Sequence, residues 1–158
     1  MAKRLLSIEN QTSQRIPRTL LNRVFFDAER SQRGTNNVSL VFVSDAAIKK
    51  LNRQHRGKSV ATDVLAFSLA AKETPGVLGE IFIAPKTARA VHGKDLPVQA
   101  LLAITFLHGL LHLYGFDHET RPAEKRMNTA EKRAVKAIPE LQRIFGGSGL
   151  VGRYSSGV

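Results

Sequence analysis

The positions of apolar and polar residues along the chain predict strands and helices that follow one another. Apolar, β-branched residues in short or alternating runs are typical of strands, whereas apolar residues spaced three and four apart are typical of helices. The first pattern predicts four strands: Leu5–Asn10, Val38–Val43, Thr62–Leu69 and Val77–Ala84. The second predicts five helices: from near Pro17 to before the turn at Gly34–Asn37, from Ser44 to Arg56, from Pro85 to about His92, from about Pro97 to Gly115, and from Pro122 to Ile138.

Each predicted helix has an apolar face that indicates packing on a core. In the first helix this face holds Ile16, Leu20, Leu21, Val24, Phe25 and Ala28, and in the second Ile48 and Leu51 point inward. Pro139 must kink or restart the last helix. Strands that alternate with helices predict one mixed α/β domain over residues 1–145. Ala70–Gly76 is predicted to be a surface loop, and the glycine- and serine-rich residues 146–158 are predicted to form a flexible tail.

The most apolar segment, Val98–Tyr114, is predicted to be a buried helix. It is shorter than the roughly 20 residues of a usual membrane span, and it contains two histidines and Gln99. The first residues contain only a two-leucine apolar patch, so we expect no secretory signal. The chain has no cysteine, which fits a reducing compartment and excludes a site built of thiolates. We therefore expect a cytoplasmic protein that does not enter a membrane.

Positive charge indicates a polyanionic partner. The 158 residues have a formal net charge of +11, and one basic run has no acid inside it: Lys49, Lys50, Arg53, Arg56 and Lys58. Such a run fits nucleic acid, an anionic membrane surface or a solvated face that keeps the protein soluble. No amphipathic helix rich in exposed aromatics favours the membrane. Few aromatic residues are present, so an RNA partner would be contacted mostly at its phosphates, with little sequence preference.

Three of the five histidines lie within eleven residues, from His108 to His118. His108 and His112 lie one turn apart on one helical face, at chelating distance. Gly115 ends the helix and lets the chain turn back, so that His118 can supply a third imidazole. Three imidazoles with an open position suit a catalytic zinc better than calcium or magnesium, which prefer oxygen ligands. The sequence therefore predicts one Zn²⁺ held by His108, His112 and His118.

The residues next to these histidines limit the reactions that the site could catalyse. Asp117 is expected outside the ligand set, where it would either orient an imidazole or cap the turn. In the HExxH arrangement of metalloproteases the residue after the first histidine is a glutamate that acts as general base. Here that residue is Gly109. A general base must come from elsewhere, or the metal alone must suffice, and a peptidase is disfavoured.

HGLLHLYGFDH, from His108 to His118, closely resembles the HGxxHLxGYDH signature of the YbeY family of bacterial metal-dependent endoribonucleases, also described as ribosomal RNA maturation factors. NRQHRGKSVATDVLAF, from Asn52 to Phe67, resembles the family's NRxYRGKDxPTDVLSF segment. LGEIFI, from Leu78 to Ile83, resembles its LGDIxI strand. The three blocks come in the family's order, and the likeness covers roughly residues 7–145.

The resemblance implies a single α/β (α+β) domain with a mixed sheet of about four strands and five or so helices. It also implies cleavage of single-stranded RNA in ribosomal RNA maturation, at the 3′ end of the small-subunit RNA, and in ribosome quality control. The ribosome or its small subunit would be the partner. Arg56 matches the arginine of the RGKD segment, which places it near the metal, so Arg56 and His108 are the expected catalytic residues.

Several points stay open at this stage. Thr62 and Asp63 match a family pair, but they also suit a strand start whose side chains bond the backbone. His55 and His92 are expected to be exposed helix residues and not ligands. Departures from the family pattern at Ser59, Ala61, Ala66, Ser68 and Glu80 affect the substrate groove and not the ligands. A non-catalytic ribosome-assembly factor with a structural zinc, and a hydrolase of peptides or small molecules, remain as alternatives.

Overall fold

The fold is described from a computed structural model, for residues 5–34, 36–69, 75–93 and 95–146. The elements follow in the order β1 (Leu6–Asn10), α1 (Arg18–Ser31), β2 (Asn37–Phe42), α2 (Asp45–Arg56), β3 (Val64–Ser68), β4 (Val77–Ile83), α3 (Pro85–His92), α4 (Val98–Leu113), α5 (Arg121–Ala137) and α6 (Pro139–Phe145). The predicted alternation of strands and helices is confirmed, with boundaries that differ by one or two residues. The helix predicted from Pro122 to Ile138 is α5, and Pro139 starts a new helix, α6, which is one of the two outcomes predicted for it.

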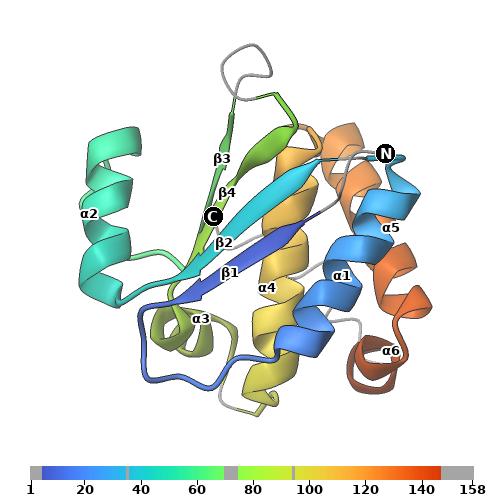
Figure 1. The fold of residues 1–158 in the computed structure, drawn as a ribbon, viewed down its shortest axis with the longest axis horizontal. Coiled ribbons are helices and arrows are strands. Elements are labelled where there is room, and N and C mark those ends of the chain that lie inside the picture. Colours follow the sequence, from blue (N-terminus) through green and yellow to red (C-terminus); the bar gives the residue numbers. More distant parts are fainter. Residues whose placement is uncertain (1–4, 35, 70–74, 94, 147–158) are drawn as a thin grey trace.

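The four strands form one mixed sheet in the order β1-β2-β4-β3 (Figure 1). β1, β2 and β4 are parallel, and β3 pairs with β4 in the antiparallel sense. A parallel pair needs a crossover connection, which α1 supplies between β1 and β2. The mixed sheet is therefore confirmed. The predicted loop Ala70–Gly76 falls mostly outside the described residues, and the predicted tail does so from residue 147 onward.

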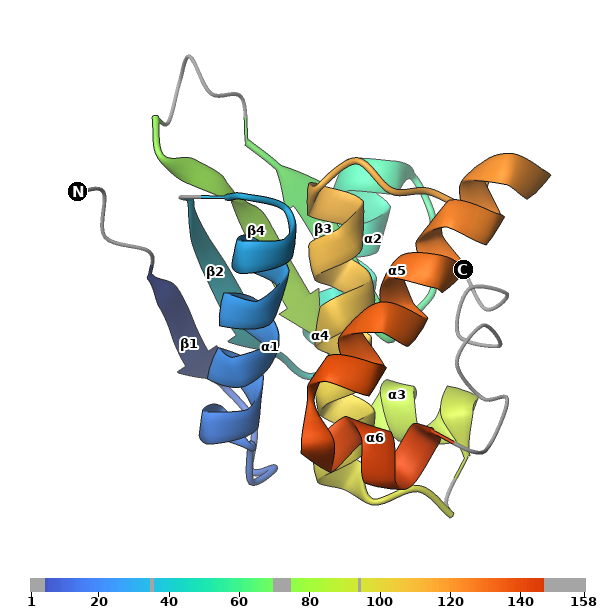
Figure 2. The same ribbon diagram turned by 90° about the vertical axis from the view of Figure 1, so that its right-hand side faces the viewer.

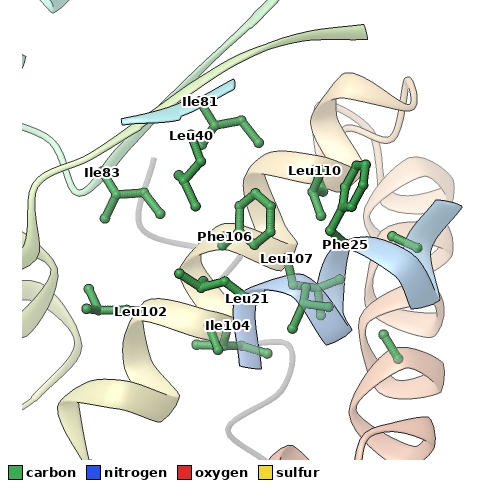
Figure 3. Close-up of a cluster of buried hydrophobic side chains, with 14 of the residues drawn as sticks. Leu21, Phe25, Leu40, Ile81, Ile83, Leu102, Ile104, Phe106, Leu107 and Leu110 are labelled. Carbon is green, nitrogen blue, oxygen red and sulfur yellow. The ribbon is translucent and has the colours of Figure 1, made fainter. Parts of the chain in front are cut away.

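Helices cover both faces of the sheet (Figures 1 and 2). α2 lies on one face, where Ile48 is fully buried against a small cluster with Val41 and Leu65. α4 and α1 cover the other face, and α5 and α6 lie outside them. Leu21 and Phe25 of α1 meet the sheet and α4 in the main core (Figure 3). The inward faces predicted for the first two helices are thus confirmed.

α4 is the central helix of the fold, because it is enclosed on nearly every side. Each residue from 101 to 111 is buried, and among them Leu102, Phe106 and Leu110 point into the core in Figure 3. A helix that is apolar all round is stable only when it is surrounded by other elements. Within the described residues, no helix combines the length and the apolar character needed to span a bilayer. α4 is thus a rigid core element, and its end carries the histidine block.

Gly79 of β4 lets the end of α4 lie directly on the sheet. A Cβ atom built there would lie 2.3 Å from the backbone oxygen of Phe67 and 2.7 Å from Cδ2 of Leu113. The backbone of Phe67 cannot move without breaking its strand. We expect Gly79→Ala to lower the free energy of unfolding by about 1–3 kcal/mol, the usual cost of overpacking, measured by urea denaturation.

The matched control for this substitution is Ser68→Ala, because Ser68 is the exposed residue that pairs with Gly79 across the sheet. Its urea midpoint should stay within a few tenths of a molar of the wild-type value, as expected for an exposed site. An unchanged midpoint in Gly79→Ala would show that the sheet tolerates the methyl group, contrary to this packing argument.

Candidate metal centre

The end of α4 is built as a turn that folds the chain back toward the helix. The N–H of Phe116 donates to the carbonyl of Leu111, and the N–H of Gly115 donates to that of His112, both at 3.0 Å. This pair of bonds is the Schellman motif, which requires a left-handed residue after the helix. Gly115 supplies it with φ of 90°. The turn predicted at Gly115 is confirmed, and it directs the next residues back over the last turn of α4.

The three predicted histidines converge. One ring nitrogen from each of His108, His112 and His118 lies within 4.8 Å of the other two. The Nε2 atoms of His108 and His112 are 3.1 Å apart. Ligand atoms of a tetrahedral zinc are separated by about 3.4 Å, given bonds of about 2.0–2.1 Å, so this pair already has suitable spacing. Across the described ranges, no other group of three or more histidine or carboxylate side chains meets in this way.

A buried histidine nitrogen without a hydrogen-bond partner fits a metal ion. Nε2 of His118 is buried and has no hydrogen bond with any of the described residues. Its ring stacks on that of His108 with centroids 5.9 Å apart and meets the His112 ring at 5.3 Å. A buried polar atom without a partner is costly unless something absent from the protein chain satisfies it. Three imidazoles without a carboxylate among them suit zinc or a similar borderline ion.

His112 is held in the neutral form that a ligand needs. Burial is the main cause that lowers its pKa, and the neighbouring His108 and His118 lower it further, to about 4. A hydrogen bond with the backbone of Phe116 acts in the opposite direction, and the charge of Arg56 adds to the lowering. Near pH 7 the imidazole therefore keeps its lone pair available for a cation.

Arg56 lies at the same cavity as the three histidines. The cavity encloses about 370 Å³ and is lined by Arg56, Val64, Ala66, His108, Gly109, His112, Asp117, His118 and Glu119. α2 ends directly after Arg56 at Gly57, and the buried side chain of Asn52 donates to the carbonyl of Val60 at 3.0 Å. The guanidinium carbon lies 6.0 Å from the centre of the Phe67 ring, within cation–π range. These contacts hold the exposed arginine beside the histidines.

The rest of the basic run is exposed, on α2 and directly after it. The side chains of Lys49, Lys50, Arg53 and Lys58 face solvent, and only Arg56 of the run lines the cavity. Exposed cations of this kind can bind the phosphates of an extended RNA strand. Phosphate binding by the four outer residues stays a prediction.

The structure shows what Asp117 and Gly109 contact. The Asp117 carboxylate accepts the backbone N–H of Glu119 at 3.0 Å, which is the turn-capping contact of the two that the sequence left open. Orientation of an imidazole by Asp117 stays a prediction. Gly109 packs on the sheet: a Cβ there would lie 3.0 Å from Cγ2 of Ile81 and 3.3 Å from Cγ2 of Val64. A glutamate at this position would thus meet the sheet.

One residue that the sequence analysis missed is Glu131, which orients His108. Nδ1 of His108 and Oε1 of Glu131 are 2.9 Å apart, and both side chains are almost fully buried. Nδ1 is thereby engaged, and Nε2 is left to face the other histidines. The signal was a carboxylate on an apolar face, since Glu131 follows buried Met127 by four residues and precedes buried Ala134 by three. The sequence alone could not show which residue this carboxylate contacts, because the contact depends on how α5 packs against α4.

The expectation that His92 is exposed is wrong. Its side chain is 8 % exposed, and its Nε2 lies 2.6 Å from Oδ2 of Asp63. The reason is the buried carboxylate of Asp63, which needs a hydrogen-bond partner and finds one in His92, the last residue of α3. The backbone of Asp63 also lies beside α3, since its carbonyl accepts the N–H of Ala84 directly before that helix. Burial raises the pKa of Asp63, but the hydrogen bond and charge of His92, with bonds from Thr62 and the backbone, hold it below the usual value. His55 is exposed as expected.

Comparison with known proteins agrees with this geometry. The family described as Endoribonuclease YbeY matches residues 2–139. A protein named Endoribonuclease YbeY from Anaeromyxobacter is 40% identical over 151 residues, covering 93% of this chain and 72% of its own. Its namesake from Syntrophotalea carbinolica is 34% identical over 151 residues, covering 89% and 98%.

The fold is also shared with a solved structure. A Thermotoga maritima protein determined in solution superimposes with a TM-score of 0.57 and 27% identity, over 90% of both chains. The family match spans nearly all of the described fold, including the three histidines and Arg56. This family match and the convergence of these residues at one cavity together show that the chain belongs to the YbeY family of endoribonucleases.

Proposed function

We propose that the protein is a zinc-dependent endoribonuclease that cleaves single-stranded RNA. The substrate we propose is ribosomal RNA, at the 3′ end of the small-subunit RNA and in ribosome quality control, in the cytoplasm and in contact with the ribosome. The observation that supports this most directly is that Arg56 and three converging imidazoles line one cavity. Relatives named endoribonucleases support the RNA substrate.

His108, His112 and His118 would hold the ion. When bound there, zinc would supply a Lewis acid for a phosphate oxygen or for a water molecule. Arg56 would bind the scissile phosphate through its fork of N–H donors and stabilise the charge that develops on it. The exposed cations of α2 would bind neighbouring phosphates and hold the strand along the cavity, without reading bases.

The experiment that tests this proposal offers RNA and peptide substrates to the same protein. Purified protein loaded with Zn²⁺ should cleave a single-stranded ribosomal RNA fragment, and should leave the duplex form and a peptide library intact. Removal of the metal with a chelator should lower RNA cleavage at least about a hundredfold, as expected when the main electrostatic stabilisation is lost. Addition of Zn²⁺ should restore it. Peptide turnover without RNA turnover would reject the proposal.

A non-catalytic assembly factor with a structural zinc is the second candidate. One observation favours it: Nε2 of His118, which lies beyond the helix end, has no hydrogen-bond partner within the described ranges. An ion at this place would tie the turn to α4 even if it took no part in catalysis. Removal of the ion would then destabilise the protein and leave no RNA cleavage to lose.

A further inference from the structure

Glu131 is a buried carboxylate with only half of its hydrogen-bonding capacity used. The residue is 1% exposed and lies on α5, in the layer outside α4. Its Oε1 atom meets Nδ1 of His108, whereas its Oε2 atom is buried and has no hydrogen-bond partner in the part of the chain that the structure describes. A buried charge that is incompletely paired opposes folding unless another charge compensates it. The protein therefore keeps an unfavourable group directly behind one of the three converging histidines.

A cation held by the histidines would compensate this charge. Only the His108 ring would separate the ion from the carboxylate, and the Glu131 charge would act through a medium of low dielectric. The hydrogen bond also fixes the His108 ring with Nε2 toward the centre, which lowers the cost of arranging the ligands. Arg56 is also positive, but it lies on the exposed side of the cavity, so it cannot neutralise Glu131 at close range.

We infer that Glu131 is a positioning residue for the metal, and that it raises zinc affinity at the expense of the stability of the metal-free protein. This inference rests on the proposed metal centre. Through this contact α5 contributes to the metal centre, since the Glu131 carboxylate reaches His108 only while α5 is packed on α4. An ordinary structural carboxylate would stabilise the protein with and without the ion. The charge of Glu131, in contrast, is expected to destabilise the metal-free protein and to stabilise the metal-bound one.

The test is Glu131→Gln, which keeps the size of the side chain and an oxygen that accepts the His108 N–H, but removes the charge. We expect the dissociation constant for Zn²⁺, measured by competition with a chromophoric chelator, to rise about 10- to 100-fold. We also expect the thermal midpoint of the metal-free variant to equal or exceed that of the metal-free wild type. The rise of the midpoint at a fixed Zn²⁺ concentration should be correspondingly smaller.

The matched control is Met127→Leu, a substitution of similar volume at the buried position one turn earlier on α5. It should shift both states alike and leave the Zn²⁺ dissociation constant within about twofold, since it changes packing and no charge. Unchanged Zn²⁺ affinity in Glu131→Gln, or a metal-free variant that is less stable than wild type or fails to fold, would overturn the inference. Neither readout involves RNA, so a wild-type protein that binds Zn²⁺ without cleaving RNA would reject the proposed function alone.

Discussion

His118→Ala should abolish zinc binding and lower RNA cleavage at least about a hundredfold, as removal of the metal does, because a ligand and the electrostatic stabilisation that depends on it are lost together. The metal-free fold should survive. Nε2 of His118 has no hydrogen bond to lose among the residues that the structure describes, and His118 lies past the last turn of α4, outside the main core. Zinc content by elemental analysis, single-turnover cleavage and the thermal midpoint of the metal-free protein are the measurements.

The control for this variant is His55→Ala, which removes an exposed histidine that does not line the cavity. It should keep one zinc per chain and nearly all of the activity. A His118→Ala protein that unfolds in the metal-free state would favour a structural role for this residue. A variant that loses zinc but still cleaves RNA would show that the three-histidine centre is not catalytic.

The sequence predicted most of the fold because its local signals agree with the tertiary contacts. The short apolar runs became the four strands, and the spacing of Leu21, Val24 and Phe25 matched the face that α1 turns to the core. The predicted boundaries were less accurate than the elements themselves. The strand predicted from Thr62 begins at Val64; Asp63 before it still accepts the N–H of Ala84 at its backbone carbonyl, and its carboxylate meets His92.

The convergence of the three histidines could be predicted because they are close in sequence. Two histidines one helical turn apart and a third beyond Gly115 determine their own geometry, with little help from the rest of the chain. Glu131 and the pair of Asp63 with His92 could not be predicted in this way. Glu131 is 23 residues from His108 in the chain, and Asp63 is 29 residues from His92. Each contact depends on how its helix, α5 or α3, packs in the fold.

The position of Arg56 could be predicted, but not from its spacing along the chain. Its place beside the histidines depends on β3, which lies between α2 and α4 and whose Val64 and Ala66 line the same cavity. Spacing along the chain could not show this, and only the resemblance of the segment from Asn52 to Phe67 to the family pattern predicted it. The structure supplies the physical reason: α2 ends at Gly57, and the guanidinium carbon of Arg56 lies 6.0 Å from the centre of the Phe67 ring of β3.

Arg56→Ala should lower kcat for RNA cleavage about 100- to 1,000-fold, the usual loss for one group that stabilises charge in a transition state, with zinc content unchanged. Arg56→Lys keeps the charge but lacks the planar fork that binds phosphate bidentately, so most of the loss should remain. Arg53→Ala, on exposed α2 outside the cavity, should instead raise KM and weaken its salt dependence, with little change in kcat. If Arg56→Ala also altered only KM, the guanidinium would be one more phosphate contact of α2, and the stabilising charge at the scissile bond would have to come from the metal alone.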